Sequence, residues 1–479
     1  MLLKLEEGPS PKGRQIVDQV QRLIRDGHLN PGEALPSTRH LAERLALHRS
    51  TVATAYQELW ALGWLELRPG AVPRVRRRGA LAAPALPERG AFPWRERLTL
   101  PLEPPPRPRP EGLISFNSLG MDPRLIPVEP LARSLKAALH REGARLLDYG
   151  DPRGLPSLRA VLAQRMGRHG VQAAPEEILV TQGAQQALDL ALRALTRPGD
   201  AVLVEAPTYD HMLRLLALHR LRPLAIPEGP EGPDLAALER LAQRESPVLL
   251  YTMPSFQNPT GRCLPQSQRE GLLALCERLA LPILEDGFEE EMKYFGRAML
   301  PLKSMDRAGL VLYAGTFSKV LAPGLRLGWL AGSATCLGAL AGLRRSTDLG
   351  PSPILQAALE DFLLKGHFDQ HLARLHRTFR RRMETALAAL RRELDPALAT
   401  WTAPSGGYLI WLALHGTPPA GLEAALHAHG VDARSGSSYF NDPESGKPFL
   451  RLSISGLDEA EITEGIARLG RALGALRHE

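Results

Sequence analysis

The sequence of 479 residues has little cysteine, few aromatic residues and no long apolar run. Cys263, Cys276 and Cys336 are far apart and odd in number, which argues against a disulfide framework and a cysteine-ligated metal site. No segment approaches the roughly 18 to 20 consecutive apolar residues of a membrane span. Met1–Gly8 also has acids where a signal peptide has a basic start. We therefore expect a cytoplasmic protein with no metal and no membrane partner.

Charge is in excess only at one end of the chain. Overall, 59 Lys and Arg face 52 Asp and Glu, a formal net charge of +7. Residues 1–78 hold 13 basic and 8 acidic residues, and a run with Arg74, Arg76, Arg77 and Arg78 closes this segment. Such a run alone is usually a solvated surface, but the concentration of charge at one end predicts an acidic partner for that end.

Helical and strand periodicity is missing from residues 79–112, which are rich in Pro and Arg. Proline fixes φ and removes a hydrogen-bond donor, so this segment should be extended and semi-rigid. We predict a linker here, between a domain of residues 1–78 and a second domain of residues 113–479.

The first domain has the pattern of three short helices and a hairpin. Apolar spacing predicts a helix that ends near Gly27, a second with its N-cap at Ser37, and a third that runs from an N-cap at Ser50 to Gly63. Short apolar segments on either side of Pro69-Gly70 predict the hairpin. This order indicates a winged helix-turn-helix, a DNA-binding fold.

In such a fold the third helix lies in the major groove of double-stranded DNA, with its first turns toward the bases and phosphates. The predicted DNA-contacting residues are Arg39, Arg49, Ser50, Thr51 and Thr54. For Thr51 and Thr54, ordinary helix surface remains an equal alternative.

The second domain alternates apolar strand-like runs with amphipathic helices. The runs are Glu177–Thr181, Ala201–Val204, Val248–Tyr251, Pro282–Glu285, Leu310–Tyr313 and Leu327–Leu330. Uniformly apolar strands predict a mainly parallel α/β sheet with helices on both faces and a ligand site at the carboxyl ends of the strands. Long helices and a strand pair near Tyr408–Leu412 and Phe449–Ser453 predict a smaller α/β subdomain at about residues 353–479.

Several strand ends carry groups suited to a phosphorylated pyridine aldehyde. Gly183, Ala184 and Gln185 open a helix whose free N–H groups suit a phosphate, although small residues at a helix start also serve close packing. Tyr209 offers a ring for stacking, with a core or rim position as the alternative. Asn258 can donate to a phenolate oxygen.

A carboxylate and a lysine complete this set. Asp286, at the end of a buried strand, would need a cation such as a protonated pyridine nitrogen. Lys319 follows another buried strand, seven residues before Arg326. Desolvation and the guanidinium both lower a lysine pKa, which frees the amine for a Schiff base. Thr316 and Ser318, together with Arg326, could complete the phosphate site.

Residues from about 113 to 475 resemble the class I, fold-type I aminotransferases, which depend on pyridoxal 5'-phosphate. The matching segments occur in the family's order: Asp148–Gly154, Gly183–Gln185, Pro207–Tyr209, Asn258–Gly261, Asp286, Ser318-Lys319, Arg326, Pro404–Gly407 and Arg451. The resemblance implies an internal aldimine on Lys319, Asp286 at the pyridine nitrogen, Asn258 at the phenolic oxygen and Tyr209 stacked on the ring. It further implies that Arg451 binds a substrate carboxylate and that Tyr149 reaches the phosphate of the neighbouring subunit in a homodimer.

The first domain resembles the GntR type, and the order of domains resembles the MocR/GabR subfamily of transcription regulators. That subfamily usually has a Tyr at the position of Phe288, whose hydroxyl also bonds the phenolic oxygen. Because Phe288 cannot donate, residual catalysis is in doubt while cofactor binding is less affected.

The resemblance implies a regulator that senses an amino compound, or pyridoxal phosphate itself, through the aldimine. Its linker could carry each DNA-binding domain over the partner's cofactor domain, in a domain-swapped dimer. The alternative is a working aminotransferase joined to a DNA-binding module. A binding module without covalent chemistry is disfavoured, because Lys319 and Asp286 are both present.

Overall fold

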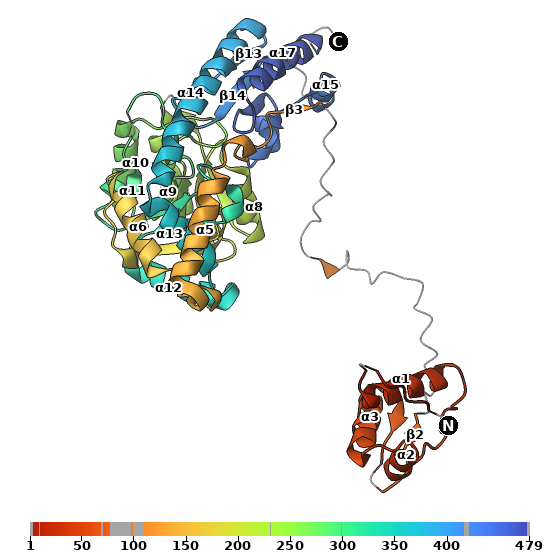
Figure 1. Ribbon diagram of the computed structural model, residues 1–479. Helices are drawn as coiled ribbons and strands as arrows, with labels where there is room; N and C mark the ends of the chain where they lie inside the picture. The colour runs from red at the N-terminus through yellow and green to blue at the C-terminus, as the bar shows by residue number, and fades with distance from the viewer. Residues whose placement is uncertain are drawn as a thin grey trace. The chain divides into compact units, whose positions relative to one another are not determined.

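The computed structural model describes residues 3–8, 10–68, 70–76, 97–98, 110, 112–229, 231–297, 299–415 and 421–476. The chain divides into two compact units, Met1–Glu103 and Pro104–Glu479 (Figure 1). Most of the predicted linker, residues 79–112, falls outside the described residues.

The first unit is a winged helix-turn-helix, as predicted. Its elements are α1 (Lys12–Arg25), α2 (Thr38–Arg44), α3 (Arg49–Ala61), β1 (Leu65–Glu66) and β2 (Arg74–Val75). The two strands pair antiparallel, with Leu65 opposite Val75. Ile16, Val20, Val52, Tyr56 and Leu59 form the centre of the core, which fixes α1 against α3.

The ends of the helices follow the predicted caps with one exception. Ser37 accepts a hydrogen bond from the His40 N–H at 3.2 Å, and Gly63 after α3 has a φ of +74°. The prediction that Ser50 caps α3 is wrong. The N-cap is His48, whose Nδ1 accepts from the Ser50 N–H at 3.4 Å, because the extended turn ends one residue before Arg49. The Ser50 hydroxyl lies 2.6 Å from that same Nδ1.

The second unit is built on a seven-stranded sheet. In order across the sheet, the strands are β4 (Ile178–Thr181), β12 (Gly328–Ala331), β11 (Val311–Thr316), β10 (Ile283–Asp286), β9 (Leu249–Thr252), β5 (Ala201–Glu205) and β6 (Arg222–Ile226). All neighbours are parallel except β12, which runs antiparallel to both β4 and β11. The connection from β11 to β12 holds only the short 3-10 helix Pro323–Leu325, whereas a parallel crossover is usually made by an α-helix. The sheet is therefore mainly parallel, as predicted.

Helices cover both faces of this sheet, since alternate residues of its apolar strands point to opposite sides. Helices α7 (Ala184–Leu195), α8 (Asp210–Leu218) and α12 (Ala334–Thr347) pack on one face. Helices α9 (Leu235–Glu245), α10 (Gln266–Arg278) and α11 (Leu302–Met305) pack on the other. Further helices of this unit are α5 (Val128–Glu142), α6 (Pro156–Gly167) and α13 (Pro353–Leu364).

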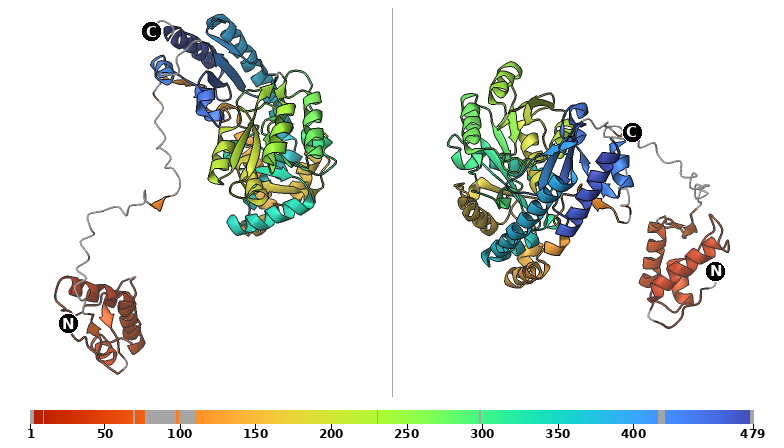
Figure 2. Two further views of the ribbon diagram at one scale, coloured as in Figure 1. Left: turned by 180° about the vertical axis from the view of Figure 1, so that it is seen from behind. Right: turned by 90° about the horizontal axis from the view of Figure 1, so that it is seen from above.

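A four-stranded sheet and two long helices form the carboxyl-terminal part. The strands, in order, are β13 (Ala399–Trp401), β14 (Leu409–Leu414), β17 (Phe449–Ser453) and β16 (Arg434–Ser435). Helices α14 (His367–Glu393) and α17 (Glu459–Ala475) lie side by side (Figure 1, Figure 2). The predicted strand pair is confirmed, with Trp411 opposite Arg451.

Short elements complete the unit. They are β3 (Ile114–Ser115), which pairs with β15 (Val431–Asp432), the hairpin β7 (Glu228–Gly229) and β8 (Gly232–Pro233), α15 (Leu422–Ala428) and α16 (Pro443–Gly446). Among the helices that the structure describes, none is both long and apolar enough to cross a membrane.

Candidate functional site

A cavity that opens to solvent lies at the carboxyl ends of the parallel strands. Its lining comes from segments after β4, β5, β9, β10 and β11, where the topology predicts a ligand. The lining residues are Leu119, Ala184, Gln185, Tyr209, Met253, Asn258, Asp286, Phe288, Thr316, Ser318, Lys319 and Arg326. The structure therefore gathers most of the predicted cofactor residues in one place.

One end of the cavity is suited to an anion. Helix α7 begins there after Gly183, and no side chain caps its N-terminus. The Arg326 guanidinium lies beside it: Nη2 donates to the Gln182 carbonyl at 2.8 Å, and a Cβ added to Gly183 would lie 3.2 Å from Nη2. Within the described part of the chain, Arg326 has no ion pair. An uncapped helix N-terminus beside a guanidinium can hold a phosphate.

Two hydroxyls lie in the turn after β11. The Thr316 hydroxyl donates to Ser318 Oγ at 3.1 Å, and the Ser318 N–H donates to Thr316 Oγ1 at 3.1 Å. Both residues line the cavity near Arg326, where they can add hydrogen bonds to a bound anion.

Asp286 carries an oxygen without a partner. Its side chain is buried, and the Tyr251 hydroxyl donates to Oδ2 at 2.9 Å, whereas Oδ1 has no hydrogen bond from the described residues. Burial raises the pKa of Asp286 to about 6, although the Tyr251 hydroxyl and the charge of Lys319 favour the ionised form. A buried, unpaired carboxylate oxygen is suited to a cationic N–H donor.

The amide of Asn258 and the ring of Tyr209 face the same cavity. Asn258 is buried, and its Oδ1 has no partner in the described part of the chain, so its amide is available to a ligand. The Tyr209 hydroxyl donates to Gln185 Oε1 at 3.2 Å, which holds the ring beside the start of α7.

Lys319 lies in the turn after β11, and its amine is held inside the cavity. Nζ donates to the Leu119 carbonyl at 3.0 Å. Burial lowers the pKa of Lys319, the charges of Arg451 and Arg326 lower it further, and those of Glu289 and Asp286 oppose them. The hydroxyl of Tyr408, the residue before β14, donates to the Lys319 carbonyl and so helps to fix this turn. The amine is therefore held in a fixed position, and its neutral form is more accessible than that of a free lysine.

Arg451 and Tyr149 lie outside the lining of this cavity. Arg451 on β17 is buried, its Nε has no partner, and its guanidinium lies over the Tyr439 ring at 5.6 Å. It has no ion pair with a described residue, but its charge reaches Lys319. Tyr149 is 83% exposed, so it does not serve the cavity of its own chain.

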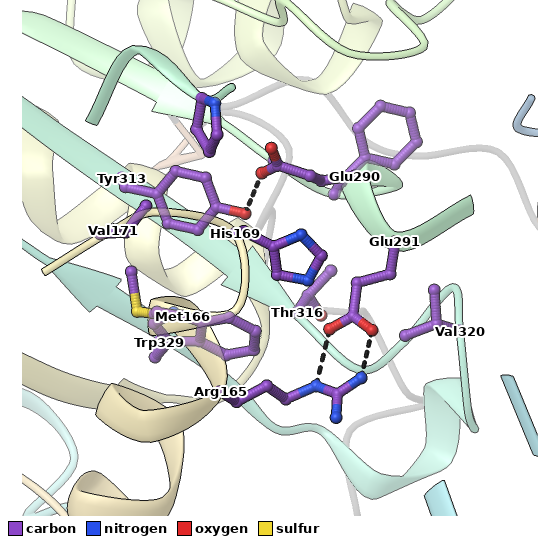
Figure 3. Close-up of a pocket in the computed structure, with 13 residues that line it drawn as sticks. Arg165, Met166, His169, Val171, Glu290, Glu291, Tyr313, Thr316, Val320 and Trp329 are labelled. Carbon is purple, nitrogen blue, oxygen red and sulfur yellow. Dashed lines mark hydrogen bonds and ion pairs between the residues drawn. The ribbon is translucent and has the colours of Figure 1, made fainter. Parts of the chain in front are cut away.

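A second, smaller cavity adjoins the first, because Phe288 and Thr316 line both. Figure 3 shows its polar pairs: the Tyr313 hydroxyl donates to Glu290 at 2.6 Å, and Arg165 pairs with Glu291 at 2.8 Å. The sequence did not predict this second cavity and its buried acids, because a run of acidic residues is usually ordinary protein surface. Leu119, Met253 and Tyr251 were also missed, since apolar or aromatic side chains of this kind are more often part of the core than of a site.

The predicted DNA-contacting residues lie at the starts of α2 and α3. Arg39, Arg49, Ser50 and Thr54 are exposed. Thr51 is half-buried, and its Cγ2 would lie 3.7 Å from a Cβ added to Gly13, so it faces α1. Arg74 donates to the Gly32 carbonyl at 2.9 Å, while Arg77 and Arg78 lie outside the described residues.

Two families of known proteins match the chain. The family described as "Aminotransferase class I and II" matches residues 122–469, and "Bacterial regulatory proteins, gntR family" matches residues 12–75. The chain is 38% identical to a 2-aminoadipate transaminase of Thermus thermophilus, over 76% of this chain and 91% of that protein. It is 31% identical to the probable rhizopine catabolism regulatory protein MocR of Rhizobium meliloti, over 99% of this chain and 96% of that protein.

A solved structure matches the second unit. It is the α-aminoadipate aminotransferase LysN of Thermus thermophilus in complex with N-(5'-phosphopyridoxyl)-L-leucine, with a TM-score of 0.72 and 35% identity. The match covers 77% of this chain and 94% of that one.

Proposed function

Because the chain belongs to the class I and II aminotransferase family and has a GntR-family domain at its amino end, we propose that it is a pyridoxal-phosphate-dependent transcription regulator. It binds double-stranded DNA and senses an amino compound, or pyridoxal phosphate itself, through Lys319. The supporting observation is the extent of the matches: the regulator MocR aligns with 99% of the chain, whereas the transaminase aligns with 76%. Such a protein acts in the cytoplasm, where the DNA is.

The residues of the cavity fit pyridoxal 5'-phosphate, the cofactor of this family. The start of α7 and Arg326 suit the phosphate, and the unpaired Oδ1 of Asp286 suits the protonated ring nitrogen. Asn258 can donate to the phenolic oxygen, and Tyr209 can stack on the ring. When bound, the cofactor supplies an aldehyde that links covalently to amines and a ring that withdraws electrons.

The side chains then have separate tasks. Lys319 offers an amine whose pKa is lowered by burial and by the charges of Arg451 and Arg326, which favours its neutral form, while Glu289 and Asp286 oppose them. Asp286 keeps a proton on the ring nitrogen, because an ionised buried carboxylate favours a cationic neighbour. Phe288 lines the cavity without donating, so the phenolic oxygen has one side-chain donor fewer than with a tyrosine there. Covalent binding of an amine is thereby retained while turnover is slow.

Arg451 indicates that the effector carries a carboxylate or a similar anion. A buried guanidinium with an unpaired Nε and no ion pair among the described residues is suited to bind one. The charge of Arg451 also lowers the pKa of Lys319. An anion bound at Arg451 would offset that charge and so raise the pKa of the lysine amine.

A homodimer is part of this proposal. Tyr149 is 83% exposed, and Leu147 two residues before it is 70% exposed, so both side chains are available to a partner subunit. In a homodimer with two-fold symmetry Tyr149 would reach the phosphate of the partner's cofactor, and the linkers would carry two winged helices to two half-sites.

A working aminotransferase remains the second candidate. Its support is the presence of both Lys319 and Asp286 and the 38% identity to a transaminase. An enzyme would have no evident use for a winged helix with exposed Arg39 and Arg49.

Two measurements on the full-length protein separate the candidates. Borohydride reduction should fix the cofactor to Lys319, as mapped by mass spectrometry. Fluorescence anisotropy with DNA from upstream of the protein's own gene should then show an affinity that changes when amino acids, amines or pyridoxal phosphate are added. Sustained conversion of a keto acid with no ligand effect on DNA binding would favour the enzyme instead.

A further inference from the structure

A short backbone segment, Phe116–Leu119, is held by the side chains that are proposed to bind the cofactor and the effector. Lys319 Nζ donates to the Leu119 carbonyl at 3.0 Å, and Arg451 Nη2 donates to the Asn117 carbonyl. Leu119 also lines the cofactor cavity. We call residues Phe116–Leu119 the strap. Because the strap accepts hydrogen bonds from both side chains, Arg451 lies next to the cofactor cavity.

The other two carbonyls of the strap are bonded as well. The Ser453 N–H donates to the Phe116 carbonyl at 2.8 Å, and the Ser455 hydroxyl donates to the Ser118 carbonyl at 3.1 Å. Ser453 is the last residue of β17, the strand that carries Arg451. Ser455 is fully buried and lies outside the lining of the cofactor cavity. The strap is therefore fixed along its whole length, in part by a residue outside the cofactor site.

The hydrogen bond from Arg451 to the strap uses a nitrogen that a carboxylate would need. A guanidinium binds a carboxylate through two parallel N–H groups. On the Nε side this pair is Nε and Nη2, the two atoms through which Arg165 binds Glu291. In Arg451, Nε has no partner among the described residues, whereas Nη2 donates to the Asn117 carbonyl. A carboxylate that bonds to Nε therefore competes with the strap for Nη2.

We propose that the strap is a built-in competitor of the effector: it occupies Arg451 until a carboxylate takes Nη2, and it is then released. The carboxylate displaces the Asn117 carbonyl because it gains two parallel hydrogen bonds and an ion pair, whereas the carbonyl accepts one hydrogen bond. The inference rests on the proposed role of Arg451 in binding the effector, and it adds a way for that binding to be communicated.

Release of the strap would reach the beginning of the second unit. Strand β3 directly precedes the strap, and the N–H groups of Ile114 and Phe116 donate to the carbonyls of Gly430 and Asp432 at 3.1 and 2.7 Å. The predicted linker to the DNA-binding domain ends at residue 112, two residues before β3. A ligand shifts such a segment only by its different affinity for the held and released states, and the competition for the guanidinium supplies that difference.

The first test compares two stable probes on the full-length protein after removal of any bound cofactor. N-(5'-phosphopyridoxyl)glycine carries a carboxylate and pyridoxamine 5'-phosphate has none, and neither has an aldehyde that could bond to Lys319. Hydrogen–deuterium exchange, measured by mass spectrometry, reports on the N–H groups of Ile114 and Phe116. We expect the glycine compound to speed their exchange and pyridoxamine phosphate to leave it unchanged. Unchanged or slower exchange with the glycine compound would overturn the proposal.

The second test uses a variant outside the cavity. Ser455→Ala removes the hydroxyl that donates to the Ser118 carbonyl and keeps both Lys319 and Arg451. Because a weakened strap competes less, the glycine compound should bind about fivefold more tightly, which is the equivalent of one hydrogen bond of ~1 kcal/mol. Pyridoxamine phosphate should gain much less. Calorimetric titration measures both affinities. A purely structural role of Ser455 would not tighten binding, so a folded variant with unchanged or weaker affinity would contradict the proposal.

Ser453→Ala is the matched control for this variant. It removes the neighbouring buried hydroxyl, which lies 3.0 Å from Ser455 Oγ and bonds to that residue rather than to the strap. The backbone N–H that donates to the Phe116 carbonyl is kept. Affinity for the glycine compound should stay near the wild-type value. An equal gain in both variants would indicate general loosening of the segment after β17 and would overturn the proposal.

Neither probe experiment involves DNA. If exchange and affinity change as expected but the protein binds no DNA, or binds it with an affinity that no ligand changes, the strap stands and the proposed regulatory function fails. If DNA affinity responds to amino compounds while the exchange of Ile114 and Phe116 does not, only the inference about the strap fails.

Discussion

At the scale of single residues, Phe288 decides how well the cavity could support catalysis. It lines both the cofactor cavity and the smaller cavity next to it, where a tyrosine would add a hydroxyl. We expect Phe288→Tyr to speed conversion of the bound cofactor to its pyridoxamine form by at least about tenfold, since a placed donor is worth ~1.4 kcal/mol or more. Stopped-flow absorbance with an amino acid measures this rate.

Phe288→Leu is the control for this change, because it alters the shape of the wall without adding a donor. It should not raise the rate. Equal rates for wild type and Phe288→Tyr would mean that the missing hydroxyl does not limit turnover.

Residues also set the limit of what the sequence could predict. Lys319, Asp286 and Asn258 each follow a uniformly apolar strand, so their meeting at one sheet edge could be expected from topology. Glu289 could not be distinguished from Glu290 and Glu291, because only the three-dimensional packing against Gly407 leaves it without a partner.

At the scale of secondary-structure elements, His371 on α14 contacts the backbone of Val320, in the turn that carries Lys319. His371 is buried, its Nε2 has no partner among the described residues, and burial lowers its pKa from 6.5 to about 4. The folded state favours the neutral form of His371 over the charged form. The contribution of this residue to the free energy of unfolding is therefore complete above pH 6.5 and is lost as the pH falls through about 4. Between pH 6.5 and about 4, each fall of one pH unit should lower the free energy of unfolding by about 1.4 kcal/mol.

Thermal unfolding of wild type and His371→Gln at pH 7 and pH 5 measures this contribution. The fall in Tm between the two pH values should be larger for wild type than for the variant. Because other groups titrate alike in both proteins, an equal fall would show that His371 plays no part.

Helix α3 carries a second prediction. Arg49→Ala should weaken binding to all DNA sequences and reduce the salt dependence by about one phosphate contact, whereas Thr54→Ala should relax preference at one base pair. Arg22→Ala, near the carboxyl end of α1, removes the same charge and should have little effect on affinity. Anisotropy titrations at several salt concentrations distinguish these cases. Loss of preference with Arg49→Ala and uniform weakening with Thr54→Ala would reverse the assignment.

The elements themselves were predicted well where a single physical pattern decided them. Six strands of the large sheet are continuous apolar runs, and all were found. The edge strand β6 was missed, because its exposed Arg222 and its Pro223 break that pattern. The start of α3 was misplaced because serine suits both the N-cap and the first turn of a helix, and only the backbone geometry at His48 decides between them.

At the scale of the whole molecule, the position of Tyr149 predicts that subunits share their sites. In a mixed dimer of Lys319→Ala and Tyr149→Phe subunits, one site would carry both defects and the other none. We therefore expect one site per dimer with wild-type cofactor affinity, as measured by absorbance titration. Sedimentation should show a dimer.

If Tyr149 acted within its own subunit, the mixed dimer would have no undamaged site, and titration would find none of wild-type affinity. A stable monomer with the cofactor fully bound would contradict the shared site altogether.

The cofactor cavity has a consequence for the lifetime of the protein. Its lining joins segments from Leu119 to Arg326, so a bound cofactor holds together strand ends that are distant in sequence. A ligand that binds only the folded state stabilises it by about 2.7 kcal/mol at a hundredfold excess over its Kd. When pyridoxal phosphate is scarce, more of the chain is open to proteases at any moment. The cellular amount of the protein would then follow the supply of its cofactor, independently of any effect on DNA binding.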